Sequence, residues 1–248
     1  MQKLSGGLWK AYVFFWFFFY FVLLYIPLLV AISRPQWHKY GYKIRTLWAR
    51  LVLAFCFIRV RVLKPPFFDF NKQYIYVANH TSYLDVLVFL AAIKGNYGFL
   101  AKKELAKIPL FGIFFRYFDV PVYRDKSEKA ITTVKKAIER VRRGDSLVIF
   151  PEGGIKGKSP HLNEFKKGAF DIATKLNLPI VPVCMPDNWR ILPDKVAAPN
   201  QQKERSNTRI IFFQPLQNDR KKTDRLSLEY SVYNLIDQAL KRHAYEDK

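Results

Sequence analysis

The clearest fold signal in the sequence is the segment Val77-Ala78-Asn79-His80-Thr81-Ser82-Tyr83-Leu84-Asp85. It continues an apolar segment from residue 74 that is typical of a buried strand, and it precedes the apolar run 86–93, which is typical of a helix. His80 therefore lies at the carboxyl end of a predicted strand, where open α/β sheets place their ligand sites. Asp85 falls in the first helical turn, where the helix dipole favours a negative charge.

His80 and Asp85 allow two interpretations. Ser82 and Asp85 before an apolar run match a capping box, in which Asp85 only closes the helix end. Alternatively, a neutral imidazole takes a proton from an alcohol, while a carboxylate on its other nitrogen fixes the tautomer and stabilises the imidazolium. The two roles are compatible, and the spacing alone does not choose between them.

Composition narrows the classes of partner. The 248 residues include 41 Lys and Arg against 20 Asp and Glu, a formal net charge of +21. This balance predicts a polyanionic partner: nucleic acid, anionic lipid or a phosphorylated substrate. Cys56 and Cys184 both lie in apolar segments without metal-ligand spacing, so we expect buried thiols, no disulfide and no metal site.

The N-terminal segment resembles a membrane anchor. No residue from Ala11 to Ile32 is charged, and as a helix this run would extend roughly 33 Å, enough to cross a bilayer core. Pro27 can kink it, so insertion into one leaflet is the alternative to a full span. Lys and Arg are more frequent after the run, which in a full span places the downstream chain in the cytoplasm. We expect a membrane-anchoring module over residues 1–65 and one further domain over 66–248.

A second apolar pattern follows the first run. Apolar residues between 44 and 58 repeat at helical spacing, with Lys43, Arg45 and Arg59 largely off the stripe. This pattern predicts either an interfacial amphipathic helix or a helix that packs on the main domain.

The rest of the chain alternates between strand and helix patterns. This alternation predicts an α/β fold with a mainly parallel sheet flanked by helices. Strands are expected at residues 74–77, 97–101, 119–123, 147–150, 180–184 and 209–213, and helices beginning near residues 83, 127, 164 and 223.

Two further strand ends carry possible binding groups. Arg124 ends one strand with a guanidinium, which suits a phosphate but is also common as a solvated side chain. Glu152, Gly153 and Gly154 follow the next strand, where paired glycines either let backbone amides approach a ligand or simply form a turn.

In chain order, these motifs resemble the blocks of the glycerolipid acyltransferases, specifically the 1-acylglycerol-3-phosphate acyltransferases. The matching segments are Asn79–Asp85, Lys102–Leu105, Val122–Arg124, Phe150–Gly153, Phe165–Phe170 and Ile180–Val183. The resemblance covers about residues 71–183, and a membrane module before that segment fits the family as well.

The resemblance implies an acyl transfer that makes phosphatidate in phospholipid biosynthesis. The donor would be acyl-CoA or acyl-carrier protein, the acceptor the sn-2 hydroxyl of 1-acylglycerol-3-phosphate (lysophosphatidate), and neither a cofactor nor a metal ion is implied. His80 would be the general base, Asp85 its orienting partner, and Lys102 a candidate for stabilising the thioester oxyanion. The residues 66–248 would then form the catalytic domain.

The acceptor site departs from the family pattern. The resemblance implies that Arg124 holds the acceptor phosphate, and that the acceptor pocket is formed by Asn79, Glu152 and Gly153. The family usually has Thr or Ser and then Arg after Glu-Gly, whereas this chain has Gly154-Ile155. We expect Lys156 or Lys158 to replace the missing arginine.

Other functions are less compatible with the sequence. An acyltransferase for another lyso-lipid acceptor is the nearest alternative, because of Gly154-Ile155. A nucleic-acid-binding protein would explain the charge, but the aromatic N-terminal run and the lack of a helix-turn-helix, RNP-like segment or zinc spacing argue against it. We therefore expect an anionic membrane surface as partner, no nucleic acid, and a catalytic domain on the cytoplasmic face.

Overall fold

The computed structural model describes residues 6–123, 127–156, 161–194, 207–217 and 224–246. Its helices are α1 (Gly6–Leu23), α2 (Tyr25–Ile32), α3 (His38–Phe55), α4 (Leu84–Ala92), α5 (Gly112–Tyr117), α6 (Ser127–Arg142), α7 (Gly168–Leu176), α8 (Asn188–Ile191) and α9 (Arg225–Glu246). Its strands are β1 (Arg59–Leu63), β2 (Ile75–Ala78), β3 (Tyr97–Lys102), β4 (Val120–Val122), β5 (Ser146–Ile149), β6 (Ile180–Cys184) and β7 (Asn207–Phe212). Short 3-10 turns lie at Pro35–Trp37 and Lys103–Lys107.

The strands form one mixed, mostly parallel sheet of seven strands in the order β1-β7-β6-β2-β5-β3-β4. From β6 to β4 every neighbouring pair is parallel, whereas β7 runs antiparallel to β6 and parallel to β1. All residues of β2, β5 and β6 are buried, as expected for central strands covered on both faces. The carboxyl ends of β2, β5, β3 and β4 therefore meet at one edge, where the predicted motifs lie.

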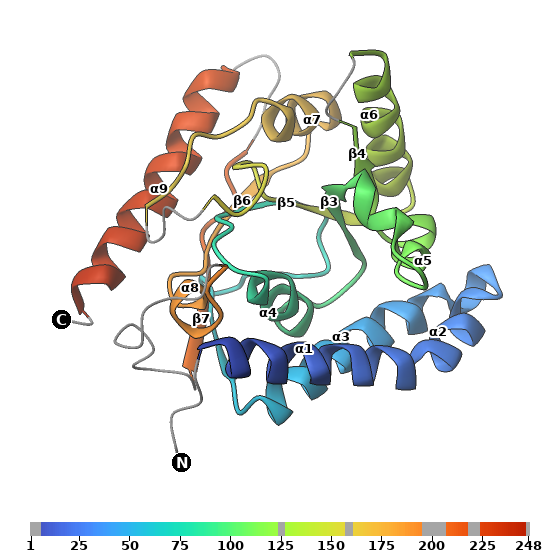
Figure 1. Cartoon of the computed structure of the whole chain (residues 1–248). Coiled ribbons are helices and arrows are strands. Elements are labelled where there is room, and N and C mark those ends of the chain that lie inside the picture. Colours follow the sequence, from blue (N-terminus) through green and yellow to red (C-terminus); the bar gives the residue numbers. More distant parts are fainter. Residues whose placement is uncertain (1–5, 124–126, 157–160, 195–206, 218–223, 247–248) are drawn as a thin grey trace.

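Helices cover both faces of the sheet (Figure 1). Helices α6, α7 and α9 lie on one face, and α4 lies on the other, with α1–α3 outside it. Successive residues of β2 divide between these layers: Ile75 and Val77 join the core under α7 and α9, and Tyr76 and Ala78 the core under α4. The predicted α/β class with flanking helices is confirmed.

One strand was missed and two helix starts differ from the prediction. Residues 59–63 form β1, which among the described strands is an edge strand paired with β7, although the sequence analysis placed them in the N-terminal module. Helix α7 begins at Gly168 and not near residue 164. Residues 163–166 are not helical, and the N–H groups of Asn163 and Lys166 donate to the loop after β5. The last helix begins at Arg225, two residues after the predicted start.

The uncharged N-terminal run folds as two helices. Helix α1 ends at Leu23, and Pro27 lies in the first turn of α2, where its missing N–H costs little. Of the described helices, α1 alone is long and apolar enough to cross a membrane by length and composition. One side of α1 contacts the rest of the protein: the indole of Trp9 donates to Ile191 O (2.7 Å), and that of Trp48 donates to Phe17 O (3.0 Å).

Helix α3 packs on α4, as the second interpretation of its apolar stripe predicts. Its buried face includes Arg45, which the sequence analysis expected on the polar side. The Arg45 guanidinium donates to Asp119 Oδ1 (2.9 Å) and lies 4.8 Å from the ring of Phe118. Asp119 also accepts from the backbone N–H of Phe99 (3.0 Å). This buried ion pair joins the N-terminal helices to the β3–β4 end of the sheet.

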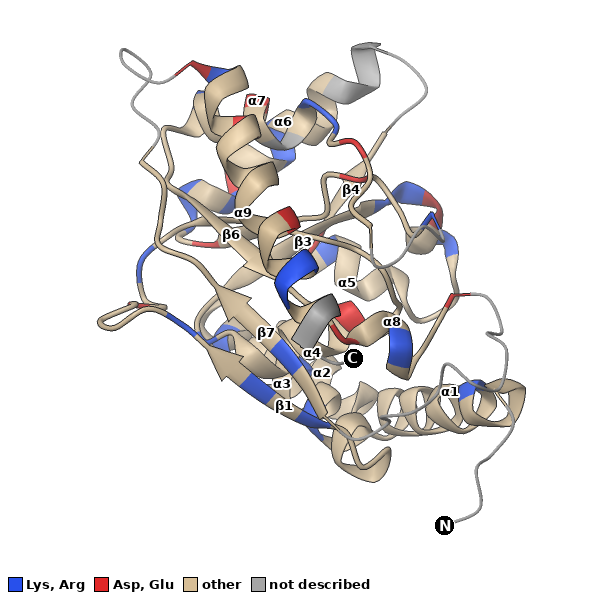
Figure 2. Cartoon of the chain, turned by 90° about the vertical axis from the view of Figure 1, so that its left-hand side faces the viewer, with Lys and Arg blue, Asp and Glu red and all other residues tan. Residues whose placement is uncertain are grey.

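Lys and Arg residues lie along the opposite end of the sheet, where β1 and β7 are (Figure 2). Arg59 and Arg61 alternate along β1 and are exposed. Charged side chains on an edge strand discourage pairing with another chain. Phe57, just before β1, is 66% exposed, so an aromatic ring lies next to this basic strand.

Candidate active site

The histidine and aspartate of the first motif are in contact. The Nδ1 atom of His80 lies 2.9 Å from Asp85 Oδ2, and the aspartate is fully buried. The backbone N–H groups of Thr81 and Ser82 also donate to Oδ2, at 2.8 and 2.9 Å. Asp85 therefore both closes the loop before α4 and holds the imidazole. Because an ionised carboxylate only accepts hydrogen bonds, Nδ1 carries the proton and Nε2 is left as the acceptor.

The loop after β5 contacts His80 through Phe150 and Glu152. The ring of Phe150 stacks on the imidazole, with 4.1 Å between centroids. Glu152 is fully buried; its Oε1 accepts from the backbone N–H of His80 (2.7 Å), and its Oε2 accepts from the backbone and side-chain amides of Asn163. Burial raises the pKa of the Glu152 carboxyl, and the N–H donors of Asn163 and His80 oppose that rise. Both oxygens of Glu152 thus contact the protein itself.

Asn79 also contacts backbone. Its Nδ2 donates to Met185 O (3.0 Å), its Oδ1 accepts from Met185 N–H (2.7 Å), and its side chain is fully buried. This double hydrogen bond joins the ends of β2 and β6 just before His80, so it fixes where the histidine leaves the sheet.

Two lysines approach the glycine turn. Gly153 and Gly154 have φ angles of +75° and +143°, which favour glycine. A methyl group on Gly153 would lie 2.8 Å from Lys166 Nζ, and one on Gly154 would lie 3.9 Å from Lys102 Cε. Lys166 is held there because its backbone N–H donates to Pro151 O (2.9 Å). The turn therefore has a lysine from β3 on one side and one from the 163–166 segment on the other.

With this geometry established, the chain can be compared with known proteins. Residues 59–186 match the family described as Acyltransferase. The chain belongs to the Acyltransferase family.

Relatives of this acyltransferase have more specific names. It is 28% identical over 211 residues to a Mycoplasma pneumoniae protein named "probable 1-acyl-sn-glycerol-3-phosphate acyltransferase", covering 79% of this chain and 78% of the relative. It is 29% identical over 190 residues to a chloroplastic 1-acyl-sn-glycerol-3-phosphate acyltransferase of Arabidopsis thaliana, covering 75% of this chain and 51% of the relative. The chain thus spans about half the length of this plant relative, and 34% of a Brassica napus one.

The fold matches a solved structure. The crystal structure of the 1-acyl-sn-glycerophosphate acyltransferase PlsC from Thermotoga maritima aligns with a TM-score of 0.75 and 20% sequence identity. The alignment covers 97% of this chain and 98% of that one, so the two share a fold along their length, the N-terminal helices included.

Part of the predicted acceptor site lies outside the described residues of the acyltransferase. Arg124 and Lys158 are both in this category, and Lys156 is exposed. Lys166 is the lysine found against the glycine turn, and the sequence analysis did not single it out. Its signal was available, because it lies in the family-like segment Phe165–Phe170; its proximity to Gly153 depends on the folding of the loop.

Sequence reasoning also missed Asn188, whose Nδ2 donates to Asp85 Oδ1 (2.7 Å). The two residues are 103 positions apart, and no short motif links them. Only the arrangement of α8 against α4 brings them together.

Other chemistry has little support in the described part of the acyltransferase. Cys56 and Cys184 are buried free thiols, as predicted; burial raises the pKa of Cys56 to about 12 and raises that of Cys184, so neither is an activated nucleophile. Among the described residues, no group of three or more His, Cys, Asp and Glu side chains is placed to hold a metal ion.

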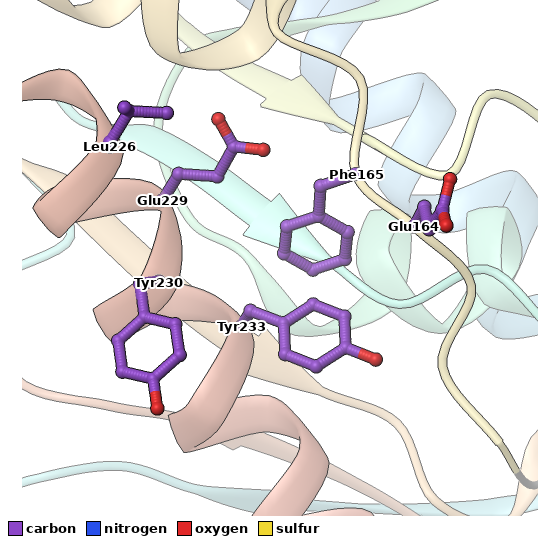
Figure 3. A pocket seen from close by; sticks show the side chains of 6 residues that line it. All are labelled: Glu164, Phe165, Leu226, Glu229, Tyr230 and Tyr233. Carbon is purple, nitrogen blue, oxygen red and sulfur yellow. The ribbon is translucent and has the colours of Figure 1, made fainter.

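A hollow of about 500 Å³ opens between α9 and the segment before α7 (Figure 3). It is lined by Glu164, Phe165, Leu226, Glu229, Tyr230 and Tyr233. The rings of Phe165 and Tyr233 pack edge to face, 5.1 Å apart. None of the predicted site residues lines this hollow, so it is separate from the candidate site.

Proposed function

We propose that the protein transfers a fatty acyl group from an acyl thioester to the sn-2 hydroxyl of 1-acylglycerol-3-phosphate. The observation that carries this proposal is the contact between His80 and buried Asp85, with Nε2 left to accept a proton. The names of the relatives support the acceptor. The donor is acyl-CoA or acyl-carrier protein.

The reaction follows from the roles of three side chains. His80 Nε2 takes the proton of the acceptor hydroxyl while the oxygen attacks the thioester carbonyl, and Asp85 stabilises the imidazolium that forms. The carbonyl oxygen becomes an oxyanion, which the ammonium of Lys102 stabilises. When the tetrahedral intermediate collapses, the C–S bond breaks, and the imidazolium gives its proton to the leaving thiolate.

The glycine turn is the proposed place for the acceptor phosphate. Lys166 puts a positive charge beside it, and Arg124 adds a second in this proposal. Lys166 does what the family arginine does elsewhere, while Lys156 and Lys158 remain predicted contributors. Glu152 and Asn79 act in this scheme by fixing His80 and the strand end, since their polar atoms bind the protein.

Gly154-Ile155 replace the Thr or Ser and the Arg that are usual in the family, so an acyltransferase for another lyso-lipid is the one alternative. To separate the two, purified protein in detergent is given acyl-CoA or acyl-carrier protein, with lysophosphatidate or a phosphate-free lyso-lipid as acceptor. Thiol release that requires lysophosphatidate supports the proposal. Faster release with the phosphate-free lipid selects the alternative.

We also propose that α1 lies in one leaflet of a membrane and does not cross it. One side of α1 contacts protein through Trp9 and Phe17, while the opposite side exposes apolar residues: Phe15 is 58%, Phe18 52% and Val22 59% exposed. A helix with protein along one side and apolar residues on the other suits the boundary between headgroups and acyl chains.

The basic end of the sheet supports binding to an anionic surface, since each Lys or Arg near such a surface contributes roughly 1 kcal/mol. The cytoplasmic face stays the predicted place of the catalytic domain, because the anionic lipids of that leaflet attract a basic surface. The domain boundary at residue 65 stays a prediction, and β1 (Arg59–Leu63), which precedes it, pairs within the catalytic sheet.

A further inference from the structure

The second oxygen of the catalytic aspartate is held by a chain of buried side chains. Asp85 Oδ1 accepts from Asn188 Nδ2 (2.7 Å), and Asn188 Oδ1 accepts from the Thr208 hydroxyl (2.5 Å). Asn188 and Thr208 are both fully buried. The chain His80–Asp85–Asn188–Thr208 therefore runs from the imidazole to β7, a strand that contributes nothing else to the candidate site.

The fold brings these residues together through the antiparallel pair of β6 and β7. Val183 pairs with Phe212 and Cys184 with Ile211, so continuing the register places residues 187–188 opposite 207–208. Asp187 and Arg209 fix this end: the guanidinium donates to Oδ2 through Nε (2.9 Å) and to Oδ1 through Nη2 (2.6 Å). The family match ends at residue 186, so Asn188 and Thr208 both lie beyond it.

Asp85 determines which way the Asn188 amide points, and Thr208 helps to hold it there. A carboxylate accepts hydrogen bonds only, so the amide must turn its NH₂ group toward Asp85. The Thr208 hydroxyl donates to the amide oxygen in this orientation and so helps to hold it, whereas the flipped amide would face Asp85 with an oxygen. Asn188 holds Oδ1 while the N–H groups of Thr81 and Ser82 hold Oδ2, and together they keep Oδ2 directed at His80.

We propose that Asn188 and Thr208 are positioning residues for the His80–Asp85 pair. They act on catalysis only through Asp85, by fixing the rotation of its carboxylate. This inference rests on the proposed role of His80 and Asp85, and it adds two residues that no motif indicates. Removing a residue that orients a catalytic group typically lowers activity 10–100-fold, as is found for the residues that hydrogen-bond to metal-bound histidines.

The test compares Thr208→Val, which removes the hydroxyl and keeps the shape, with Thr208→Ser, which keeps the hydroxyl. Asn188→Ala is the second variant. We expect Thr208→Val and Asn188→Ala to lower kcat about 10–100-fold with KM for both substrates within about twofold, and Thr208→Ser to stay near wild type. Equal kcat in the valine and serine variants overturns the inference, as does a loss confined to KM.

A double-mutant cycle separates positioning from general stability. If the amide acts only by holding the carboxylate, Asn188→Ala should cost little in the background of Asp85→Asn, because no charged carboxylate remains to orient. A full additional loss in that background contradicts the inference. If Asn188→Ala does not fold, Thr208→Val takes its place in the cycle, and Thr208→Ser is the control.

His80→Ala distinguishes failure of this inference from failure of the proposed function. If His80→Ala is inactive while Thr208→Val is fully active, only the inference about Asn188 and Thr208 fails. If His80→Ala retains wild-type turnover, the proposed function of the pair fails, and the inference with it.

Discussion

Replacing Glu152 by glutamine tests the loop that supports the base. The two oxygens of Glu152 accept three hydrogen bonds, one from His80 N–H and two from Asn163. Glutamine has one oxygen, so whichever way its amide turns, its NH₂ group meets a donor. The less costly orientation leaves the part-buried N–H of His80 unpaired, which costs about 1–3 kcal/mol. At about 2–4 °C per kcal/mol for a chain of this size, the melting temperature should fall by roughly 2–12 °C.

Activity should fall with stability, because the unpaired N–H shifts the backbone of the base. A displacement approaching 1 Å costs about 10²-fold in rate, so we expect kcat to fall by up to that factor while KM for the acceptor changes little. The assay is steady-state acyl transfer with both substrates varied, beside a thermal melt. Glu164→Gln, an exposed carboxylate in the same segment, is the matched control. A raised acceptor KM with unchanged kcat and melting temperature would refute the supporting role and favour direct contact with the acceptor.

The same variant predicts a pH dependence. Burial raises the pKa of Glu152 above its ordinary value of 4.5, so the native state binds this proton more tightly than the unfolded state. The stabilisation from this group is then fully present below about pH 4.5 and is lost as pH rises through the native pKa. Glutamine does not titrate, so the stability difference between wild type and variant should shrink from pH 4 to pH 7. A difference that grows with pH contradicts the direction of the shift.

Three other predictions concern separate parts of the molecule. Lys166→Ala should raise KM for lysophosphatidate about ten- to a hundredfold and leave KM for the donor unchanged. Lys167→Ala, at the next residue, should leave both KM values unchanged. Equal effects of the two variants in steady-state kinetics would show that Lys166 does not bind the phosphate. Phe15→Ser should weaken vesicle binding roughly tenfold or more in sedimentation without changing the melting temperature, whereas Ile131→Ser on α6, across the sheet, should change neither. Asp119→Asn removes the charged partner of the buried Arg45 guanidinium, so the free energy of unfolding measured in urea should fall by about 3–5 kcal/mol. A fall below about 1 kcal/mol would show that water hydrates the guanidinium in place of the carboxylate.

The sequence could predict the elements whose signals are local. Alternating apolar segments predicted the central strands. One of the two interpretations of His80 and Asp85 required a contact between them, and this contact lies within one loop and one helical turn. β1 was missed because its residues follow an amphipathic helix. The alternation of Arg59, Val60 and Arg61 is strand-like, but the segment is short and its arginines look like the solvated side of that helix.

Contacts between distant elements could not be predicted. The burial of Arg45 depends on Asp119, 74 residues away, and the sequence alone makes any arginine next to an apolar stripe look solvated. Asn188 reaches Asp85 because of the register of β6 and β7, which no single segment encodes. Lys166 lies at the glycine turn in a segment, 163–166, that is not helical, although a helix was expected to begin near residue 164.

The central claim is that His80 is the base of an acyl transfer to lysophosphatidate. The most direct measurement is thiol release from acyl-CoA by wild type and His80→Ala, each in detergent with and without lysophosphatidate, at matched folding by thermal melt. We expect release by wild type only when lysophosphatidate is present, and at least about 10²-fold slower release by the variant. Release that ignores the acceptor, or a His80→Ala rate close to wild type, would contradict the account.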